Sequence, residues 1–162
     1  MKTGETLVKT PKTYRVTPFV RVSNAIVGML LRAGLPLGPN YLLTVRGRRS
    51  GVEHTIPVAL VEHDGHRYLQ SPFGNVNWIR NVRAAGDGTL RRGRHVERFT
   101  VTELSPVQAA PILKVIVNMA PKYVRDFLSV TRESSLEDFI DESPNHPVFE
   151  IHPAGQSVRG AA

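Results

Sequence analysis

The chain has 162 residues, the size of one domain, with 41% hydrophobic and 22% charged residues and a formal net charge of +7. It contains no cysteine, which excludes disulfides, cysteine-ligated zinc, iron–sulfur clusters and thiol nucleophiles. The positive charge favours an anionic partner, such as nucleic acid, acidic lipid headgroups or a phosphorylated cofactor.

The N-terminal region favours a cytoplasmic protein. Residues 1–15 carry lysines where a signal peptide needs an apolar run, and no stretch approaches the roughly 18 apolar residues of a membrane-spanning helix. We expect a single domain over residues 1–162, with residues 1–16 as a flexible basic N-terminus and residues 154–162 as a frayed tail.

A helix is predicted to begin at Thr17-Pro18, where a capping hydroxyl precedes a first-turn proline, and to end at Gly34. Its apolar residues recur at helical spacing: Val22, Ile26, Met29, Leu30 and Ala33. This stripe either packs on the rest of the domain or lies on the anionic inner face of the membrane. The lysines and arginines around it favour the second alternative.

From Tyr41 onward the pattern changes to short strands, which we expect over residues 41–45, 54–62, 67–70, 89–91, 95–103 and 147–152. Helices are expected over residues 75–85 and 134–140, and a third from Ser105, where a capping box is present and Pro111 suggests a later start or a bend. Asp64-Gly65 predicts a hairpin turn, and Gly86 predicts a helix C-cap.

The first motif with chemical content is Gly47-Arg48-Arg49-Ser50-Gly51, between two predicted strands. Two glycines let the backbone turn sharply and come close to a ligand. Two arginines offer planar, permanently charged groups that suit phosphate oxygens. The alternative is an ordinary basic hairpin tip.

The second motif runs from Ser71 through a loop with Gly74 into a helix that carries Trp78, the only tryptophan. The start of that helix would present free backbone N–H groups to an anion. The alternative is that Trp78 only anchors the core.

Other charged groups are assigned to the surface, and no metal site, nucleophile elbow or Walker-type loop is predicted. His63 and His66 flank the predicted hairpin turn and are expected to be solvated. One acidic cluster is likewise expected to be a wet surface: Glu137, Asp138, Asp141 and Glu142.

Together the two motifs resemble the deazaflavin-dependent nitroreductase family of the split-barrel flavin-binding superfamily, from about Tyr41 to Glu103 and more loosely to His152. The residues that carry the resemblance are Leu43-Thr44, Gly47 to Gly51, Pro57-Val58, Asp64-Gly65, Ser71, Gly74, Trp78, Asn81 and Ala84. The resemblance implies a mainly β (α+β) fold, an FMN-binding-like split β-barrel with flanking helices. It also implies coenzyme F-420, an 8-hydroxy-5-deazaflavin, as cofactor, with FMN as the alternative.

The resemblance further implies three groups of cofactor-binding residues. At the phosphate these are Gly47, Arg48, Arg49, Ser50 and Gly51. The deazaflavin ring would be bordered by Pro57, Val58, Leu69 and Ser71, and the pocket closed by Asn77, Trp78, Ile79 and Asn81. Tyr123 matches a tyrosine on the acceptor side, and Ser71 and Tyr123 are the candidate catalytic residues, each able to deliver a proton or a hydrogen bond.

The implied function is an oxidoreductase that passes hydride from reduced coenzyme F-420 to a small organic acceptor: a quinone, an activated alkene or a nitro compound. The cofactor carries this chemistry, so the protein needs only placement and electrostatics. Two departures from the family matter: Pro72 stands where a lysine is usual, and Val76 where a proline precedes the tryptophan.

The alternatives are an FMN-binding relative and a non-catalytic, membrane-docked binder of a hydrophobic ligand such as a fatty acid. Nucleic-acid binding through Arg46–Arg49 and Arg91–Arg98 ranks last, because too few aromatic residues accompany these arginines to form a stacking platform. The sequence predicts no oligomeric state.

Overall fold

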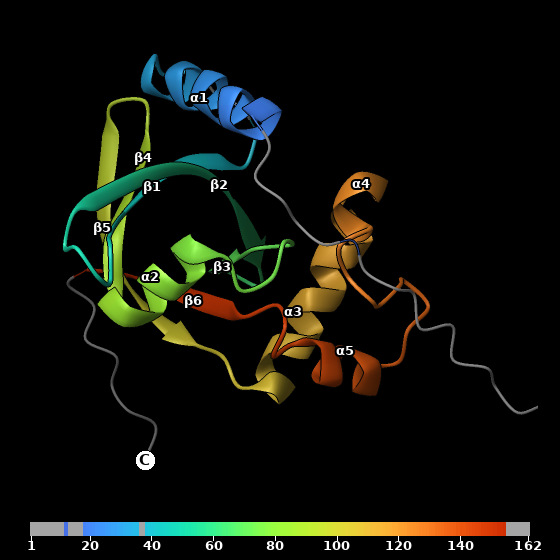
Figure 1. Cartoon of the computed structure of the whole chain (residues 1–162). Helices are drawn as coiled ribbons and strands as arrows, with labels where there is room; N and C mark the ends of the chain where they lie inside the picture. The colour runs from blue at the N-terminus through green and yellow to red at the C-terminus, as the bar shows by residue number, and fades with distance from the viewer. Residues whose placement is uncertain (1–11, 13–17, 36–37, 155–162) are drawn as a thin grey trace, which may run out of the picture.

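Six antiparallel strands close into a barrel in the computed structural model of the protein, which describes residues 12, 18–35 and 38–154 (Figure 1). The strands are β1 (Asn40–Arg46), β2 (Glu53–His63), β3 (His66–Gln70), β4 (Asp87–Arg92), β5 (His95–Glu103) and β6 (Val148–Pro153). Their order around the barrel is β1-β2-β3-β6-β5-β4, so the last strand of the chain lies between β3 and β5. The predicted barrel with flanking helices is confirmed.

The barrel has an inner and an outer core because successive residues of a strand face opposite sides. On β3, Leu69 is fully buried in the barrel interior, whereas Tyr68 joins an outer cluster. The interior is filled by these side chains: Leu43, Val45, Val58, Leu60, Leu69, Leu90, Phe99, Phe149 and Ile151, with Ile79 and Val82 from a helix. Burial of this apolar surface is the main force that holds the barrel together.

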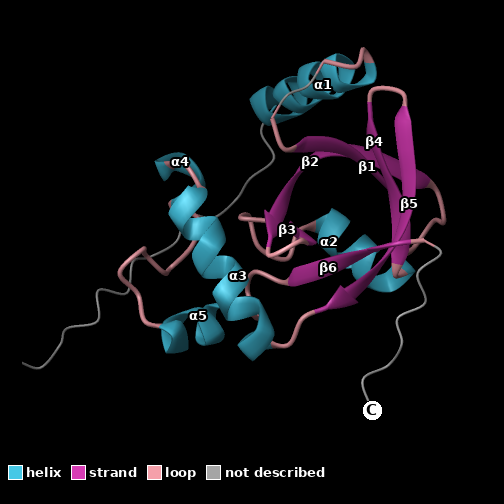
Figure 2. Ribbon diagram, turned by 180° about the vertical axis from the view of Figure 1, so that it is seen from behind, coloured by secondary structure: helices cyan, strands magenta, loops and turns pink. Residues whose placement is uncertain are grey.

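Five helices are present in the described ranges: α1 (Pro18–Arg32), α2 (Asn77–Ala85), α3 (Pro106–Met119), α4 (Lys122–Arg125) and α5 (Leu136–Glu142). Since Ile79 and Val82 lie in the interior cluster, α2 covers one end of the barrel. Figure 2 shows α3, α4 and α5 together on one flank and α1 over another part of the wall. The outer cluster joins α3 and α5 to β3 and β6 through Leu113, Val117, Phe139 and Val148.

Three local signals of the sequence are confirmed in detail. Asp64 and Gly65 have φ of 50° and 76° in the β2–β3 hairpin. Gly86 ends α2 at φ 71° and donates its N–H to Val82 O. Ser105 forms the capping box with Gln108 at the start of α3.

Two predictions about helices differ from the structure. Helix α3 does not start late: it begins at Pro106 with Pro111 inside it, and because Pro111 and Val107 are both exposed, water can reach the Val107 carbonyl, which lacks a donor. The buried face of α1 is also different, because Gly28 and Leu31 face the barrel while Ile26 and Met29 are 48% and 61% exposed. Gly28 permits a close approach, since a Cβ there would lie 3.8 Å from Leu42 Cδ2.

Some expectations fall on residues that the structure does not describe. They concern the side chain of Val22, the N-terminus apart from Lys12, and the tail beyond Ala154. In the described ranges, no helix has the length and apolar character needed to cross a membrane.

Candidate functional site

The loop between β1 and β2 is a closed turn that exposes its two arginines. Gly47 N–H donates to Val52 O and Gly51 N–H donates to Gly47 O, both at 2.8 Å. Gly51 has φ of 70°, a backbone conformation that favours glycine. At Gly47 there is no room for a side chain, because a Cβ would lie 2.9 Å from His54 Nε2. Arg48, Arg49 and Ser50 are exposed on this turn.

Helix α2 holds Arg48 through Asn81. The Asn81 Oδ1 atom accepts from Arg48 N at 3.3 Å and from Arg48 Nη1 at 2.9 Å. Asn81 is only 7% exposed. The two sequence motifs, more than thirty residues apart, are therefore joined in space, and the guanidinium of Arg48 is fixed in direction.

The neighbouring arginines differ in how far they are already paired. Arg83 donates two hydrogen bonds of 2.7 Å to Glu103, which raise the pKa of Arg83 despite partial burial, and Arg46 lies 3.3 Å from Asp87. Arg49 has no salt-bridge partner within the described part of the chain.

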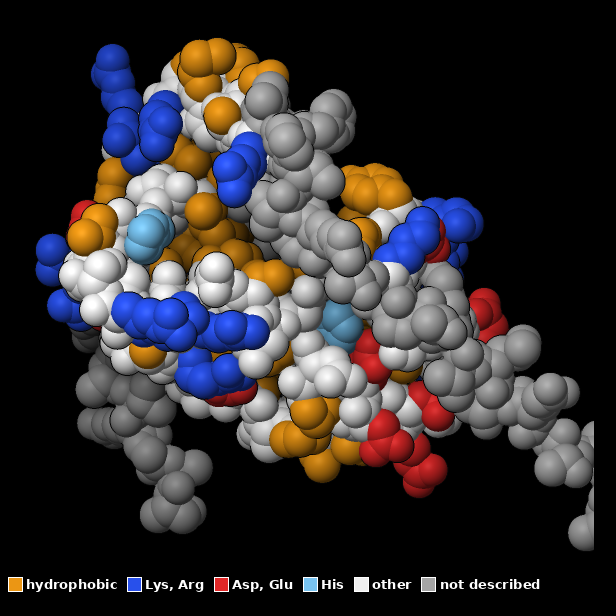
Figure 3. Space-filling model, in the orientation of Figure 1, with side chains coloured by type: hydrophobic (Ala, Val, Ile, Leu, Met, Phe, Trp, Pro, Cys, Tyr) orange, Lys and Arg blue, Asp and Glu red, His pale blue; other side chains and the backbone are white. Residues whose placement is uncertain are grey.

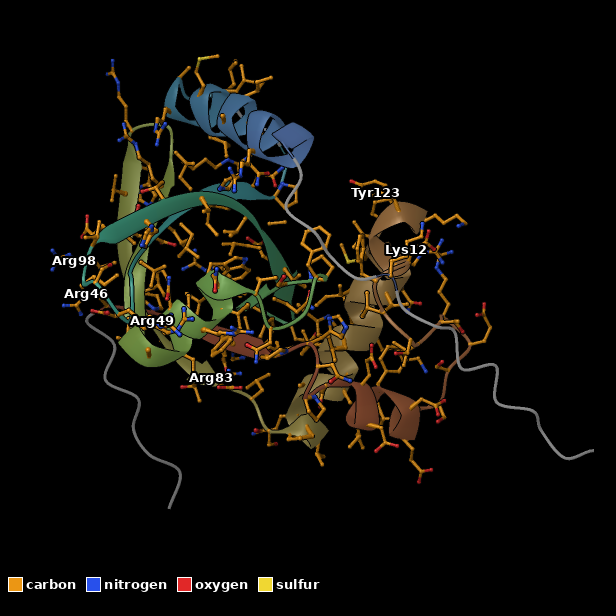
Figure 4. The ribbon with its side chains drawn as sticks, in the orientation of Figure 1. Lys12, Arg46, Arg49, Arg83, Arg98 and Tyr123 are labelled. Atoms are coloured by element: carbon orange, nitrogen blue, oxygen red, sulfur yellow. The ribbon has the colours of Figure 1, made fainter. Side chains whose placement is uncertain are left out.

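Figure 4 shows Arg49 near α2, with Arg46 and Arg98 farther out at the barrel edge. Figure 3 shows Lys and Arg side chains gathered here beside a hollow with an apolar floor.

The Ser71 loop follows β3 and leads to α2. Ser71 is 1% exposed, and its Oγ accepts from Phe73 N at 3.2 Å. Gly74 N–H donates to Ser71 O, and Gly74 O accepts from Val76 N at 2.9 Å. The N-cap of α2, Val76, makes no side-chain cap hydrogen bond, so its own side chain satisfies none of the first N–H groups of this helix.

The residues expected at the ring lie on two faces of the barrel. Val58 and Leu69 are in the interior, 6% and 0% exposed, so they can offer a ligand only their backbone. Pro57 is on the opposite face, level with Leu42 on β1. Leu60 pairs with Leu69 at the end of the β2–β3 ladder, and Ser71 directly follows the last residue of β3.

The helix residues expected to close the pocket also divide by burial. Asn77 is exposed at the start of α2, whereas Ile79 is fully buried in the barrel core. Trp78 is half-buried and packs against that core. The tryptophan therefore anchors α2 and still presents part of its ring.

Tyr123 lies on α4 and is 71% exposed. Figure 4 shows it at the tip of α4, away from the labelled arginines of the barrel edge. The segment after α4 reaches the Ser71 loop, because the rings of Phe73 and Phe127 meet edge-to-face at 4.9 Å. The structure thus brings the segment after Tyr123 to the loop, but not the Tyr123 hydroxyl to the arginines.

One assignment from the sequence is wrong: Glu142 is not part of a wet surface. It is 5% exposed, its carboxylate accepts from Ser129 N and Ser129 Oγ, and it lies 3.2 Å from His146 Nε2. Sequence reasoning missed His146, although the spacing of four between Glu142 and His146 is a signal for such a pair. No cluster of described residues could hold a metal ion.

Comparison with known proteins agrees with this architecture. A model of the F420H(2)-dependent quinone reductase family matches residues 13–134. No curated protein matches the chain.

Among solved structures, one named as a domain-swapped dimer is 21% identical, with a TM-score of 0.51 over 84% of this chain and 100% of its own. An F420-H2 dependent reductase is 23% identical, with a TM-score of 0.48 over 70% of this chain and 94% of its own. A protein named as a putative 5-nitroimidazole antibiotic resistance protein, from Bacteroides thetaiotaomicron, is 10% identical. Its TM-score is 0.49 over 78% of this chain and 79% of its own. The first of these likenesses supports the fold.

Proposed function

The chain belongs to the F420H(2)-dependent quinone reductase family, whose members are oxidoreductases that use coenzyme F-420, and on this premise we propose that it reduces a quinone. When bound, the reduced coenzyme supplies the hydride. The protein then has to bind a phosphorylated anion, orient a flat ring and keep water away from it.

The residues of the β1–β2 turn fit an anionic group. Arg49 is exposed and unpaired within the described residues, Arg48 is held in one direction by Asn81, and the uncapped start of α2 offers backbone N–H groups. Arginine guanidinium groups and the backbone N–H groups at the start of a helix are usual binding partners of phosphate. The Arg48–Asn81 contact is the observation that carries the proposal, because it presets one charge at the turn.

We assign the two candidate catalytic residues different roles. The Ser71 hydroxyl is buried and accepts from Phe73 N, so Ser71 shapes the loop at the expected ring edge. The Tyr123 hydroxyl is exposed and can donate to the carbonyl oxygen of a quinone. An activated alkene or a nitro compound would offer an acceptor oxygen or a flat conjugated system to the same residue.

The experiment follows the absorbance of reduced coenzyme F-420 with the purified protein and a water-soluble quinone. We expect oxidation that depends on the protein, and for Tyr123→Phe a lower rate at saturation with nearly unchanged coenzyme affinity. Tight coenzyme binding without transfer to quinones, alkenes or nitro compounds would instead favour the non-catalytic carrier. Binding of FMN but not of coenzyme F-420 would overturn the cofactor assignment.

A peripheral position on an anionic membrane is a second proposal, which the exposed face of α1 favours. Ile26 and Met29 point outward, and the basic residues Arg21 and Arg32 are exposed on the same helix. The fraction of protein that sediments with vesicles of anionic lipid should be smaller for Met29→Glu than for the wild type. For the wild type it should fall at high salt. Val107→Glu is the control, because Val107 is equally exposed on the distant α3. Equal sedimentation of all three proteins would reject this position.

A further inference from the structure

A buried ion pair lies directly behind the Ser71 loop. His146 follows α5, and its Nε2 is 3.2 Å from Glu142 Oε1, with both side chains only 6% exposed. The other ring nitrogen, Nδ1, is 3.3 Å from the carbonyl oxygen of Ser71. One imidazole therefore connects the end of α5 to the loop that leads into α2.

Both nitrogens of this ring face oxygen atoms that accept hydrogen bonds. A backbone carbonyl can only accept, and Glu142 accepts at Oε1 from Ser129 N (2.9 Å) and at Oε2 from Ser129 Oγ (3.0 Å). Burial alone would raise the pKa of Glu142, but the hydrogen bonds from His146 and Ser129 outweigh it and hold that pKa below its usual value. Glu142 Oε1 and the Ser71 carbonyl oxygen are thus two acceptors that face the two nitrogens of one ring, an arrangement that a ring donating from both nitrogens would satisfy.

The Ser71 carbonyl oxygen, which faces His146 Nδ1, is also part of the hydrogen bonding within the loop. It accepts from Gly74 N at 3.2 Å, while Phe73 N binds the Ser71 hydroxyl. The loop packs closely against the residue before His146, because a Cβ at Gly74 would lie 3.1 Å from Asn145 O. A shift of His146 would therefore move the Ser71–Gly74 loop.

We propose that His146, held as an imidazolium by Glu142, is a positioning residue that fixes the Ser71–Gly74 loop and thereby sets the rate of hydride transfer. Among the described residues, Glu142 is the only charged side chain that pairs with the ring; the Ser71 loop and the Ser129 segment present neutral groups to the pair. His146 acts through the loop and touches neither coenzyme nor acceptor. The effect on rate rests on the function proposed above.

The first test uses the cofactor-free protein and measures the loop itself. Nitrogen-15 NMR at neutral pH should find both ring nitrogens of His146 protonated. His146→Gln keeps one donor but removes the charge, and amide exchange at Phe73 and Gly74 should become about 10-fold faster or more. Gly51, whose N–H is bonded within the β1–β2 turn, should keep its rate and serves as the internal reference. Glu142→Gln should give the same pattern and replaces His146→Gln if that variant does not fold.

The second test measures catalysis with reduced coenzyme F-420 and a quinone. His146→Gln should lower the rate at saturation by about 10-fold, since small misplacements cost large factors. The coenzyme dissociation constant should stay within about 3-fold, because Arg48 and Arg49 are untouched. His95→Gln is the matched control: its side chain is 75% exposed on β5.

A neutral His146 ring in the wild-type protein, or loop exchange and rates unchanged in His146→Gln, would overturn the proposal. If the wild-type protein neither binds the coenzyme nor reduces a quinone, the proposed function fails and the effect on rate fails with it. The NMR and exchange measurements still decide whether His146 fixes the loop.

Discussion

Asn81 Oδ1 accepts two hydrogen bonds from Arg48, one from the backbone N at 3.3 Å and one from Nη1 at 2.9 Å. One buried amide on α2 therefore fixes both the path of the β1–β2 turn and the direction of its first guanidinium. A charge that is already oriented loses less entropy when an anion binds than a free side chain would lose.

Asn81→Ala should accordingly weaken the binding of coenzyme F-420 although Asn81 need not touch it. We expect about a 10-fold rise in the dissociation constant and a loss of roughly 1–2 kcal/mol in the free energy of unfolding, since two hydrogen bonds are lost. Fluorescence titration and urea unfolding measure the two effects. Asn118→Ala, an exposed change on α3, should alter neither. Unchanged affinity in Asn81→Ala would mean that the phosphate lies elsewhere.

Arg49 and Arg83 provide a paired comparison of an available and a committed charge. Arg49→Ala should raise the coenzyme dissociation constant by about 10- to 100-fold. At higher salt concentration the dissociation constants of this variant and the wild type should differ less. Arg83 is bonded to Glu103, so Arg83→Ala should leave affinity nearly unchanged and cost at most about 1 kcal/mol of stability. Equal losses of affinity in both variants would show that the site responds only to overall charge.

The local parts of the fold could be predicted from the sequence because their causes are local. The Asp64-Gly65 turn, the Gly86 C-cap and the Ser105 capping box each depend on residues within a few positions. The closure of the barrel could not be derived in this way. The position of β6 between β3 and β5 depends on pairings of more than forty residues in separation, for which a single sequence has no signal.

The candidate site shows the same division. The glycine-flanked arginines were visible as a motif, but the Arg48–Asn81 contact joins two motifs and appears only when α2 packs on the barrel. The sequence could not decide whether the apolar stripe of α1 packs on the barrel or faces outward, because apolar residues surround much of that helix and the buried Gly28 carries no apolar signal. Glu142 was misjudged because composition suggests that acidic clusters are solvated.

Gly88 and Gly28 should respond in opposite ways to alanine. A Cβ at Gly88 would lie 2.9 Å from both Phe99 Cζ and Thr44 O, so Gly88→Ala should lower the free energy of unfolding by about 1–3 kcal/mol through overpacking. Gly28 lies inside α1, and a Cβ there would make only an ordinary contact of 3.8 Å with Leu42 Cδ2. Gly28→Ala should therefore raise the free energy of unfolding by about 0.5–1 kcal/mol. Urea unfolding of both variants measures the difference. A stable Gly88→Ala protein would contradict the close packing of β4 on β5.

The last prediction concerns acid stability and Glu142. The pKa of Glu142 lies below its usual value in the folded protein, because the hydrogen bonds from His146 and Ser129 outweigh the opposing effect of burial. Between the folded and the unfolded pKa the unfolded chain binds more protons, so stability rises with pH across that window. The contribution of Glu142 is therefore fully present above about pH 4.5, the ordinary glutamate range, and is lost as the pH falls through the folded pKa.

Glu142→Gln removes this titration and takes the carboxylate partner away from the buried His146. At neutral pH we expect it to cost on the order of 3 kcal/mol, as is usual when one partner of a buried pair is removed. The difference from the wild type should shrink as the pH is lowered below about 4.5, because wild-type Glu142 then becomes neutral as well. Urea unfolding at a series of pH values measures both curves, with Glu137→Gln, exposed on the same helix, as the control. If the curves of wild type and Glu142→Gln stay parallel down to pH values where folding is lost, Glu142 is not the carboxylate that the contacts with Ser129 and His146 require.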